Sequence, residues 1–313
     1  MLSKVAERVY WMARSLERTE NTARLISVHT SLLMDMPAEM EINWFTLVKI
    51  FNAESLYHEL HLTINEPDIM HFLVADENNP SSLISSLSSV RENVRTTLDI
   101  LPEDMWEQVN QAHLLIKETV PTIRNRHRRQ LMLRRVISHC QAILGVLESH
   151  LCRNHTYDFV QTGKYLERAD MTSRILEMTS LLLSDARSDT LRQYESILWT
   201  NVLQSLSAHQ MYLQHMRPPV KGDNVLRFLV QSDVFPHAIR YAVMQIAVYV
   251  EHLPTPKQVL ITQKIVLKHL MSEDVGSIPA EEVHILMDYL QSELTELHVQ
   301  IAQTWFTPQV QAD

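Results

Sequence analysis

The residues of this chain that could do chemistry are four carboxylates, which occur in two pairs at the same spacing. Glu17 and Glu20 stand three residues apart, and Arg24 follows four residues later. The arrangement returns 150 positions further on, at Glu167, Asp170 and Arg174. Residues at i, i+3 and i+7 share one face of a helix, so each segment would present a carboxylate pair with an arginine one turn below.

Two interpretations of this charged face stay open. In the structural one, Glu20 pairs with Arg24 inside its helix and Glu17 pairs with an arginine of the other segment, which fixes the register of two helices. In the functional one, the four carboxylates converge on a pocket, where they bind a metal, a cationic group or a peptide end, or serve as general acid and base. Carboxylates alone would favour magnesium, calcium or manganese, but the nearby arginines argue against a metal.

A pocket of this kind would draw its binding groups from the same two segments. Helical geometry places Arg18 and Arg168 further round their helices than the carboxylates, and places Tyr10 above Glu17. The candidate binding residues are Arg18, Arg24, Arg168, Arg174, Asn21, Tyr10 and Trp11.

The charged spacing belongs to a longer internal repeat. Residues 14–24 read RSLERTENTAR, and residues 164–174 read KYLERADMTSR. Further matches follow at an offset of 150 and then of 156: Trp44 with Tyr194, Leu47 with Ile197, Leu56 with Leu206, residues 72–74 with 228–230, and Pro80 with Pro236. A repeat of this length predicts two related halves, at about 1–150 and 151–313, within a single unit that spans 1–313. We expect the two motif helices to lie side by side about a pseudo-twofold axis.

The composition predicts an all-α fold. Only 4 glycines occur in 313 residues, whereas average usage would give about 22, and sheet proteins need glycine at their tight turns. Apolar residues recur at helical spacing almost throughout the chain. This periodicity predicts helices over about 1–34 and 44–56, after Pro80 and Pro236, and over 103–151 and 256–306, with breaks at Pro37, Pro121, Gly276 and Pro279 and a loose tail after Pro308. We expect a helical bundle.

The scarcity of glycine also bears on cofactors and location. No two glycines lie close enough to form a phosphate-binding loop, so the sequence holds no nucleotide-binding motif and leaves the cofactor unknown. The two cysteines, Cys140 and Cys152, form no disulfide framework, and residues 1–18 carry charges instead of a signal-peptide core. No apolar run is long enough to cross a bilayer, so we expect a cytoplasmic protein without a membrane span.

One basic cluster stands out in a chain whose formal net charge is −9. Its partner-docking candidates are Arg124, Arg126, Arg128 and Arg129, with Arg134 and Arg135 close behind. No aromatic residue is interleaved for base stacking, so nucleic acid is not an expected partner. The cluster is either an ion-paired or solvated helix face, or a surface that docks an acidic partner.

A second group has a spacing that could hold a divalent metal, although the match is weak. Glu54, His58 and His61 fall on one helix face at i, i+4 and i+7. Their order is not that of a zinc protease motif, and the sequence offers no independent third element, so a surface cluster is the favoured interpretation.

Three stretches of the chain resemble the bacterial alpha-E domain family. They are residues 1–12, residues 16–24 (LERTENTAR) and residues 165–172 (YLERADMT), and the resemblance extends over essentially the whole chain. It implies an all-helical protein whose gene commonly lies beside genes for circularly permuted ATP-grasp ligase-like proteins and transglutaminase-like peptidases.

The resemblance and the residues together lead to two functional expectations. The first is a helical accessory protein in a peptide-synthesising or peptide-modifying system, with an ATP-grasp-like ligase, a transglutaminase-like peptidase, or both as partners. The second is a stand-alone enzyme that uses Glu17, Glu20, Glu167 and Asp170 for acid–base or metal-assisted chemistry on an amide. The absence of a nucleophile motif and a nucleotide loop favours the first.

Overall fold

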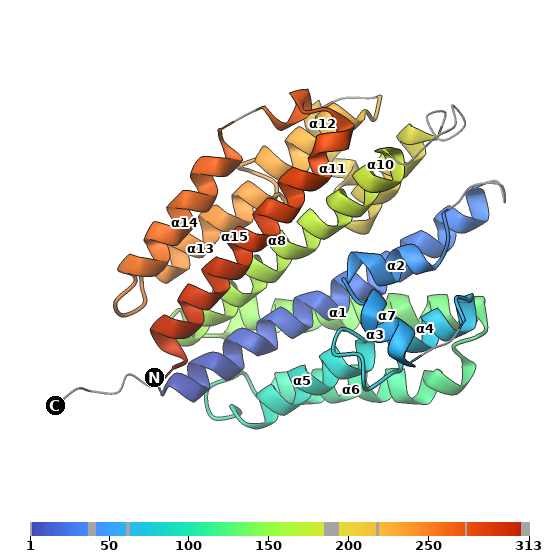
Figure 1. Ribbon diagram of the computed structural model, residues 1–313. Coiled ribbons are helices and arrows are strands. Elements are labelled where there is room, and N and C mark those ends of the chain that lie inside the picture. Colours follow the sequence, from blue (N-terminus) through green and yellow to red (C-terminus); the bar gives the residue numbers. More distant parts are fainter. Residues whose placement is uncertain are drawn as a thin grey trace.

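The computed structural model describes residues 2–36, 42–60, 63–184, 194–216, 219–272 and 274–307. Within these ranges the chain forms helices and no strand, as the composition predicts. Figure 1 shows two groups of helices, one formed by the blue-to-green part of the chain and one by the green-to-red part.

The first group is a four-helix bundle with a short-helix connection. Helix α1 packs against α5 and α7, and α6 packs against α5 and α7. The bundle helices are α1 (Ser3–Asp35), α5 (Leu83–Arg95), α6 (Asp104–Thr119) and α7 (Arg126–His150). Between α1 and α5 lie α2 (Phe45–Ile50), α3 (Glu54–Leu60) and α4 (Glu66–Val74).

The second group has the same order of long and short helices. Helix α8 packs against α13 and α15, and α14 packs against α13 and α15. The bundle helices are α8 (His155–Ser184), α13 (Ile239–Val250), α14 (Lys257–Leu270) and α15 (Ala280–Trp305). Between α8 and α13 lie α10 (Glu195–Ser205), α11 (His209–Met216), α12 (Gly222–Leu226) and a π-helical turn, Arg227–Gln231.

The two bundles meet along α1 and α8, the helices that carry the charged segments. Their closest approach involves Gly163, where an added Cβ would lie 2.5 Å from the backbone oxygen of Tyr10. A side chain at position 163 would therefore push the helices apart. The prediction that the motif helices lie side by side is confirmed.

Local sequence signals explain where several helices begin. The side chains of Asn65, Ser82 and Asn125 each accept a hydrogen bond from the backbone N–H three residues later, which caps α4, α5 and α7. A 3₁₀ turn, Val120–Thr122, contains Pro121 and separates α6 from α7, as predicted.

One helix prediction is wrong. A continuous helix was expected over 44–56, but α2 ends at Ile50 and α3 begins at Glu54. Asn52 lies between them in the left-handed region, with φ of 50°. Asparagine tolerates this conformation better than most residues, and apolar periodicity cannot detect such a one-residue break. The predictions for Pro37 and for the tail after Pro308 fall outside the described residues.

The structure also bears on the two cysteines and on the expectation that no segment spans a membrane. Cys140 is buried in α7, Cys152 is exposed just beyond that helix, and both are free thiols. No helix within the described ranges is both long and apolar enough to cross a bilayer.

Candidate functional site

The charged segments of α1 and α8 are joined by two reciprocal ion pairs. Glu17 accepts hydrogen bonds from Arg168, at 2.8 Å from Nε to Oε1 and 2.9 Å from Nη2 to Oε2. Glu167 accepts from Arg18, at 2.5 Å from Nε to Oε1 and 3.0 Å from Nη2 to Oε2. Each pair is bidentate, the geometry in which guanidinium and carboxylate interact most strongly. The structural interpretation correctly expected Glu17 to pair with an arginine of the other segment.

Arg14 adds a third cation to this cluster. Its Nε donates to Oε2 of Glu167 at 2.7 Å, and its guanidinium lies 5.0 Å from the ring centroid of Trp11. Burial alone would raise the pKa of Glu167, but the charges and hydrogen bonds of Arg18 and Arg14 outweigh it and lower the pKa to about 2. Glu167 is therefore a permanently ionised acceptor and not a proton donor near neutral pH.

The remaining two carboxylates pair within their own helices. Arg24 donates to Glu20 at 2.5 Å, and Arg174 donates to Asp170 at 2.9 Å, both in i, i+4 geometry. Burial and the neighbouring charge of Glu17 raise the pKa of Glu20, against the opposing effect of Arg24. Glu20 also accepts from Nε2 of Gln141 on α7, at 3.2 Å.

Burial separates these interactions from ordinary surface ion pairs. Glu17 is 1% exposed and Glu167 is fully buried. Each of the four candidate catalytic carboxylates is occupied by at least one arginine. Glu17 and Glu167 accept from arginine on both oxygens, which makes them poorly suited to bind a metal or to abstract a proton, whereas Glu20 and Asp170 each accept from arginine on one oxygen. The arrangement is suited to locking two helices together.

The other candidate binding residues of the motif are also built into the interior. Tyr10 is fully buried, its hydroxyl lies 2.8 Å from Nδ1 of His298, and burial raises its pKa to about 12. Trp11 is half-buried and meets both Tyr10 and His298 edge-on. Asn21 is buried, and its Nδ2 has no hydrogen-bond partner.

Two contributors to this region were not among the predicted site residues. His237 is half-buried, with Nδ1 unpartnered, and its backbone oxygen accepts from Thr172 of α8 at 2.9 Å. Burial, together with the charges of Arg168, Arg24 and Lys164, holds the pKa of His237 well below its usual range. Lys164 is itself buried and pairs with Glu148 of α7 at 3.1 Å. The spacing of residues in the sequence could not predict that His237 lies against α8, because His237 is 65 residues away from Thr172 along the chain.

The basic cluster of α7 divides into a buried and an exposed part. Arg129 is 1% exposed and donates to Glu66 of α4 at 2.6 Å and to the carbonyl of Ile123 at 3.1 Å. Arg126 is exposed but also binds Glu66. Arg129, included among the docking candidates, is unavailable to an external partner because its guanidinium is enclosed by the fold. Arg124 and Arg128 are exposed, as are Arg134 and Arg135.

The metal candidates are only partly covered by the structure. Glu54 and His58 lie on α3, where the ring of His58 packs against Phe45 and Tyr57. His61 lies outside the described residues. Among the residues that are described, no group of three or more His, Cys, Asp and Glu side chains is arranged to hold a metal ion.

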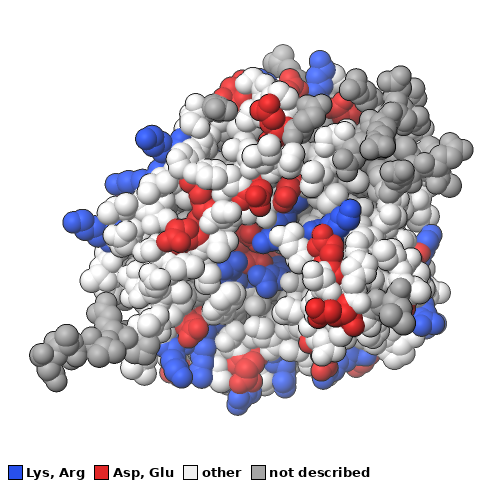
Figure 2. Space-filling model, viewed as in Figure 1, with Lys and Arg blue, Asp and Glu red and all other residues white. Residues whose placement is uncertain are grey.

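Figure 2 shows where charge gathers on one face of the molecule. Acidic and basic side chains of both signs crowd a hollow near the middle of this face, over the line where α1 runs beside α8 and α15. A surface of mixed sign offers no broad single-sign field for nucleic acid.

Comparison with known proteins gives one match. A family model, Alpha-E, described as a predicted alpha-helical domain with a conserved ER motif, matches residues 1–306. Neither a curated protein nor a solved structure matches the chain.

Proposed function

The chain belongs to the Alpha-E family, and we propose that it is a helical accessory protein of a peptide-synthesising or peptide-modifying system. Its partner in this proposal is a separately encoded ATP-grasp-like ligase, alone or with a transglutaminase-like peptidase. One observation supports a non-catalytic role above all: Glu17, Glu20, Glu167 and Asp170 are each held by arginine. An ATP-dependent partner favours the cytoplasm, and two free thiols fit its reducing conditions.

In this proposal the ER motif of the family has a structural role, which is to join the two bundles. The chain contains three Glu-Arg dipeptides, which begin at Glu7, Glu17 and Glu167. In two of them, the glutamate of one dipeptide binds the arginine of the other. We take Glu17-Arg18 and Glu167-Arg168 as the ER motif, which sets the angle between the two bundles and hence the shape of any surface that spans both.

The proposed internal duplication is supported by local backbone geometry. Asn52 and Ser207 both adopt positive φ, of 50° and 53°. The residue after each, Ala53 or Ala208, donates its N–H to the backbone oxygen five positions earlier. These matches give an offset of 155, which pairs Trp44 with Trp199 and not with Tyr194. The added residues fall in the connection before α10, so the offset of 150 within the motif is unaffected.

Packing supports the proposed pseudo-twofold relation in the same way. Helix α2 of the first half contacts α8 of the second, and α10 of the second half contacts α1 of the first. Buried positions of α7 and α15 also correspond at a constant offset of 154, for example Cys140 with Leu294 and Leu147 with Ile301. Reciprocal contacts of this kind are expected when two copies of one unit pair through the same surface.

A stand-alone enzyme remains the second candidate, and a single observation favours it. The raised pKa of Glu20, caused by burial and by Glu17, is a property that general acids share. Glu20 is also less enclosed than Glu17, with 13% of its side chain exposed.

The test is reconstitution with an ATP-grasp-like protein from the same organism. The two proteins are co-expressed, complex formation is measured by size-exclusion chromatography with light scattering, and ATP consumption is followed with peptide substrates. The accessory role predicts a stable complex and ligase turnover that rises when the chain is added, with Glu20→Gln as effective as the wild type. Absence of a complex, or loss of turnover in Glu20→Gln while the complex persists, would contradict this role and favour the enzyme.

A further inference from the structure

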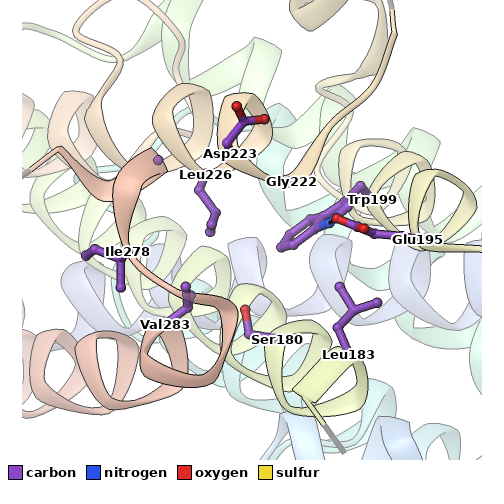
Figure 3. Close-up of a pocket in the computed structure, with 10 residues that line it drawn as sticks. Ser180, Leu183, Glu195, Trp199, Gly222, Asp223, Leu226, Ile278 and Val283 are labelled. Carbon is purple, nitrogen blue, oxygen red and sulfur yellow. Dashed lines mark hydrogen bonds between the residues drawn. The ribbon is translucent and has the colours of Figure 1, made fainter. Parts of the chain in front are cut away.

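The second half of the chain contains a pocket that is separate from the ion pairs of the motif. Its volume is about 310 Å³, and it lies between α8, α10, α12 and the segment that leads into α15 (Figure 3). Polar and apolar surface both line the pocket, and its apolar walls are formed by Leu183, Leu226, Ile278 and Val283. A pocket of this size suits one side chain or a small ligand.

The charged residues that line this pocket are both acidic. Glu195 and Asp223 are exposed side chains on α10 and α12, and they lie on either side of Gly222 and Trp199 in Figure 3. Oε1 of Glu195 accepts from the indole N–H of Trp199 at 3.1 Å, and no described lysine or arginine pairs with Glu195. Arg227 lies nearby, with Nη1 3.8 Å from Oδ2 of Asp223, and Asp274 holds it with two hydrogen bonds of 2.7 and 2.8 Å. Glu195 is therefore the carboxylate at the entrance that is left to pair with a cation.

An unsatisfied polar group lies at the apolar end. Ser180 on α8 is 1% exposed, and its Oγ has no hydrogen-bond partner. Figure 3 shows this oxygen directed toward the space that the labelled side chains enclose. A buried hydroxyl without a partner costs free energy, so the site gains when a ligand supplies a hydrogen bond.

The first half shows what occupies the corresponding place there. With the offsets given above, Trp199 corresponds to Trp44 and Val283 corresponds to Arg129. The guanidinium of Arg129 lies 5.5 Å from the ring centroid of Trp44 and pairs with Glu66 at 2.6 Å. In the second half the residue that matches Glu66 is Gly222, at an offset of 156. The protein's own arginine and its carboxylate are thus replaced by Val283 and Gly222. The indole of Trp199 packs against Gly222, where an added Cβ would lie 2.6 Å from Nε1 of Trp199, and Val283, which is much smaller than arginine, lines the pocket.

We propose that this pocket binds a guanidinium group carried on an aliphatic chain. The guanidinium would pair with Glu195 at the entrance and lie against Trp199, as Arg129 does with Glu66 and Trp44 in the first half. The aliphatic part would contact Leu226 and Val283. Three features do not depend on the duplication: the acidic entrance, the apolar walls and Ser180. The duplication indicates which cation would bind, because the corresponding place in the first half holds the guanidinium of Arg129. The inference goes beyond the accessory role and does not depend on it.

The probe is N-butylguanidine, with N-butylurea as its neutral counterpart of nearly equal shape. The full chain is titrated with each compound by isothermal calorimetry. For a ligand this small we expect a dissociation constant on the order of millimolar. Butylguanidine should bind saturably and more weakly at high salt, whereas butylurea should not bind. Equal binding of both compounds, or binding of neither, would overturn the proposal.

Three variants locate the site. Glu195→Gln should weaken butylguanidine binding by about tenfold or more, because a charge-assisted hydrogen bond is lost. Val283→Arg would place the chain's own guanidinium in the pocket and should abolish binding. Glu118→Gln, at an exposed position on α6, is the matched control and should bind as the wild type does. Wild-type affinity in Glu195→Gln would rule out this pocket even if Val283→Arg fails to fold.

A further comparison separates two sources of the ligand. A short arginine-containing peptide with blocked ends is titrated beside butylguanidine. Tighter binding of the peptide would assign the pocket to an arginine of a peptide or partner protein, and equal binding would assign it to a free small guanidine. Failure of the peptide and butylguanidine alike would overturn the guanidinium site and leave the accessory role untouched.

Discussion

Glu17 on α1 and Arg168 on α8 form a bidentate pair with hydrogen bonds of 2.8 and 2.9 Å. They are 151 residues apart in the chain, and both lie at the contact between the two bundles. Because Glu17 and Glu167 are buried, this pair and its reciprocal partner, Glu167 with Arg18, join the two helices inside the protein.

Removing Glu167 should destabilise the protein more than removing an exposed partner of arginine. Glu167→Ala leaves Arg14 and Arg18 without their carboxylate inside the interface, and we expect a loss of roughly 3–5 kcal/mol in the free energy of unfolding. Glu92→Ala, which breaks an exposed pair with Arg95, should cost much less, because solvent screens that pair. Urea unfolding followed by circular dichroism measures both. Similar losses in the two variants would show that burial does not strengthen the motif pairs.

Gly163 should be required for the close approach of α1 and α8. Gly163→Ala brings a methyl group against the backbone of Tyr10, and we expect a loss of about 1–3 kcal/mol in stability. Gly145→Ala is the control, because a Cβ there meets nothing within 4 Å. The free energy of unfolding of that variant should rise by about 1 kcal/mol, because alanine has a higher helix propensity than glycine. A stabilising effect at both positions would contradict the close approach.

Stability should fall as the pH drops below the ordinary range of histidine. Burial lowers the pKa of His29 from 6.5 to about 4, against the opposing effect of its hydrogen bond to the carbonyl of Asn43. A histidine kept neutral in the folded state contributes stability that is complete above pH ~6.5 and is lost as the pH falls toward ~4. The slope is at most about 1.4 kcal/mol per pH unit for each such group.

The variant His29→Gln isolates this contribution. Glutamine can still donate to Asn43 but does not titrate, so the decline in stability between pH ~6.5 and ~4 should become shallower. His298 and His237, whose pKa values are also lowered by burial, keep part of the slope. An unaltered slope in His29→Gln would contradict the burial of a neutral imidazole.

The two parts of the basic cluster should respond differently to truncation. Arg129→Ala removes a buried guanidinium from beside Trp44 and leaves Glu66 with only the exposed Arg126 as an arginine partner, and we expect a loss of roughly 3 kcal/mol. Arg128→Ala removes an exposed side chain and should change the free energy of unfolding by less than about 0.5 kcal/mol. Thermal unfolding of the two variants in parallel measures the difference. A large loss in Arg128→Ala would show that the exposed arginines also stabilise the fold.

Much of the fold could be predicted because helices leave a periodic signal in the sequence. The ends of α1 and the break between α6 and α7 follow from apolar spacing and from Pro121. The break at Asn52 could not be predicted, since a single left-handed residue leaves the apolar pattern almost unchanged.

The sequence predicts the ion pairs within a helix, but it does not identify the partners that lie on other helices. The spacing of Glu20 and Arg24 predicts their pairing, because the contact is local. The partners of Arg18 and Arg129 depend on side chains 149 and 63 residues away, which only the packed helices bring together. The pocket beside Trp199 has no sequence signal of its own, since its lining residues come from α8, α10, α12 and α15, which only the packed fold brings together.

The most direct test of the account is a double-mutant cycle between Glu17 and Arg168. Glu17→Gln, Arg168→Gln and the double variant are unfolded in urea, and the coupling free energy is calculated from the four proteins. A buried pair that joins the bundles predicts a coupling of about 1–3 kcal/mol, with the double variant more stable than the two single losses would suggest. A coupling near zero would show that the two residues do not act together and would contradict the structural role proposed for the motif.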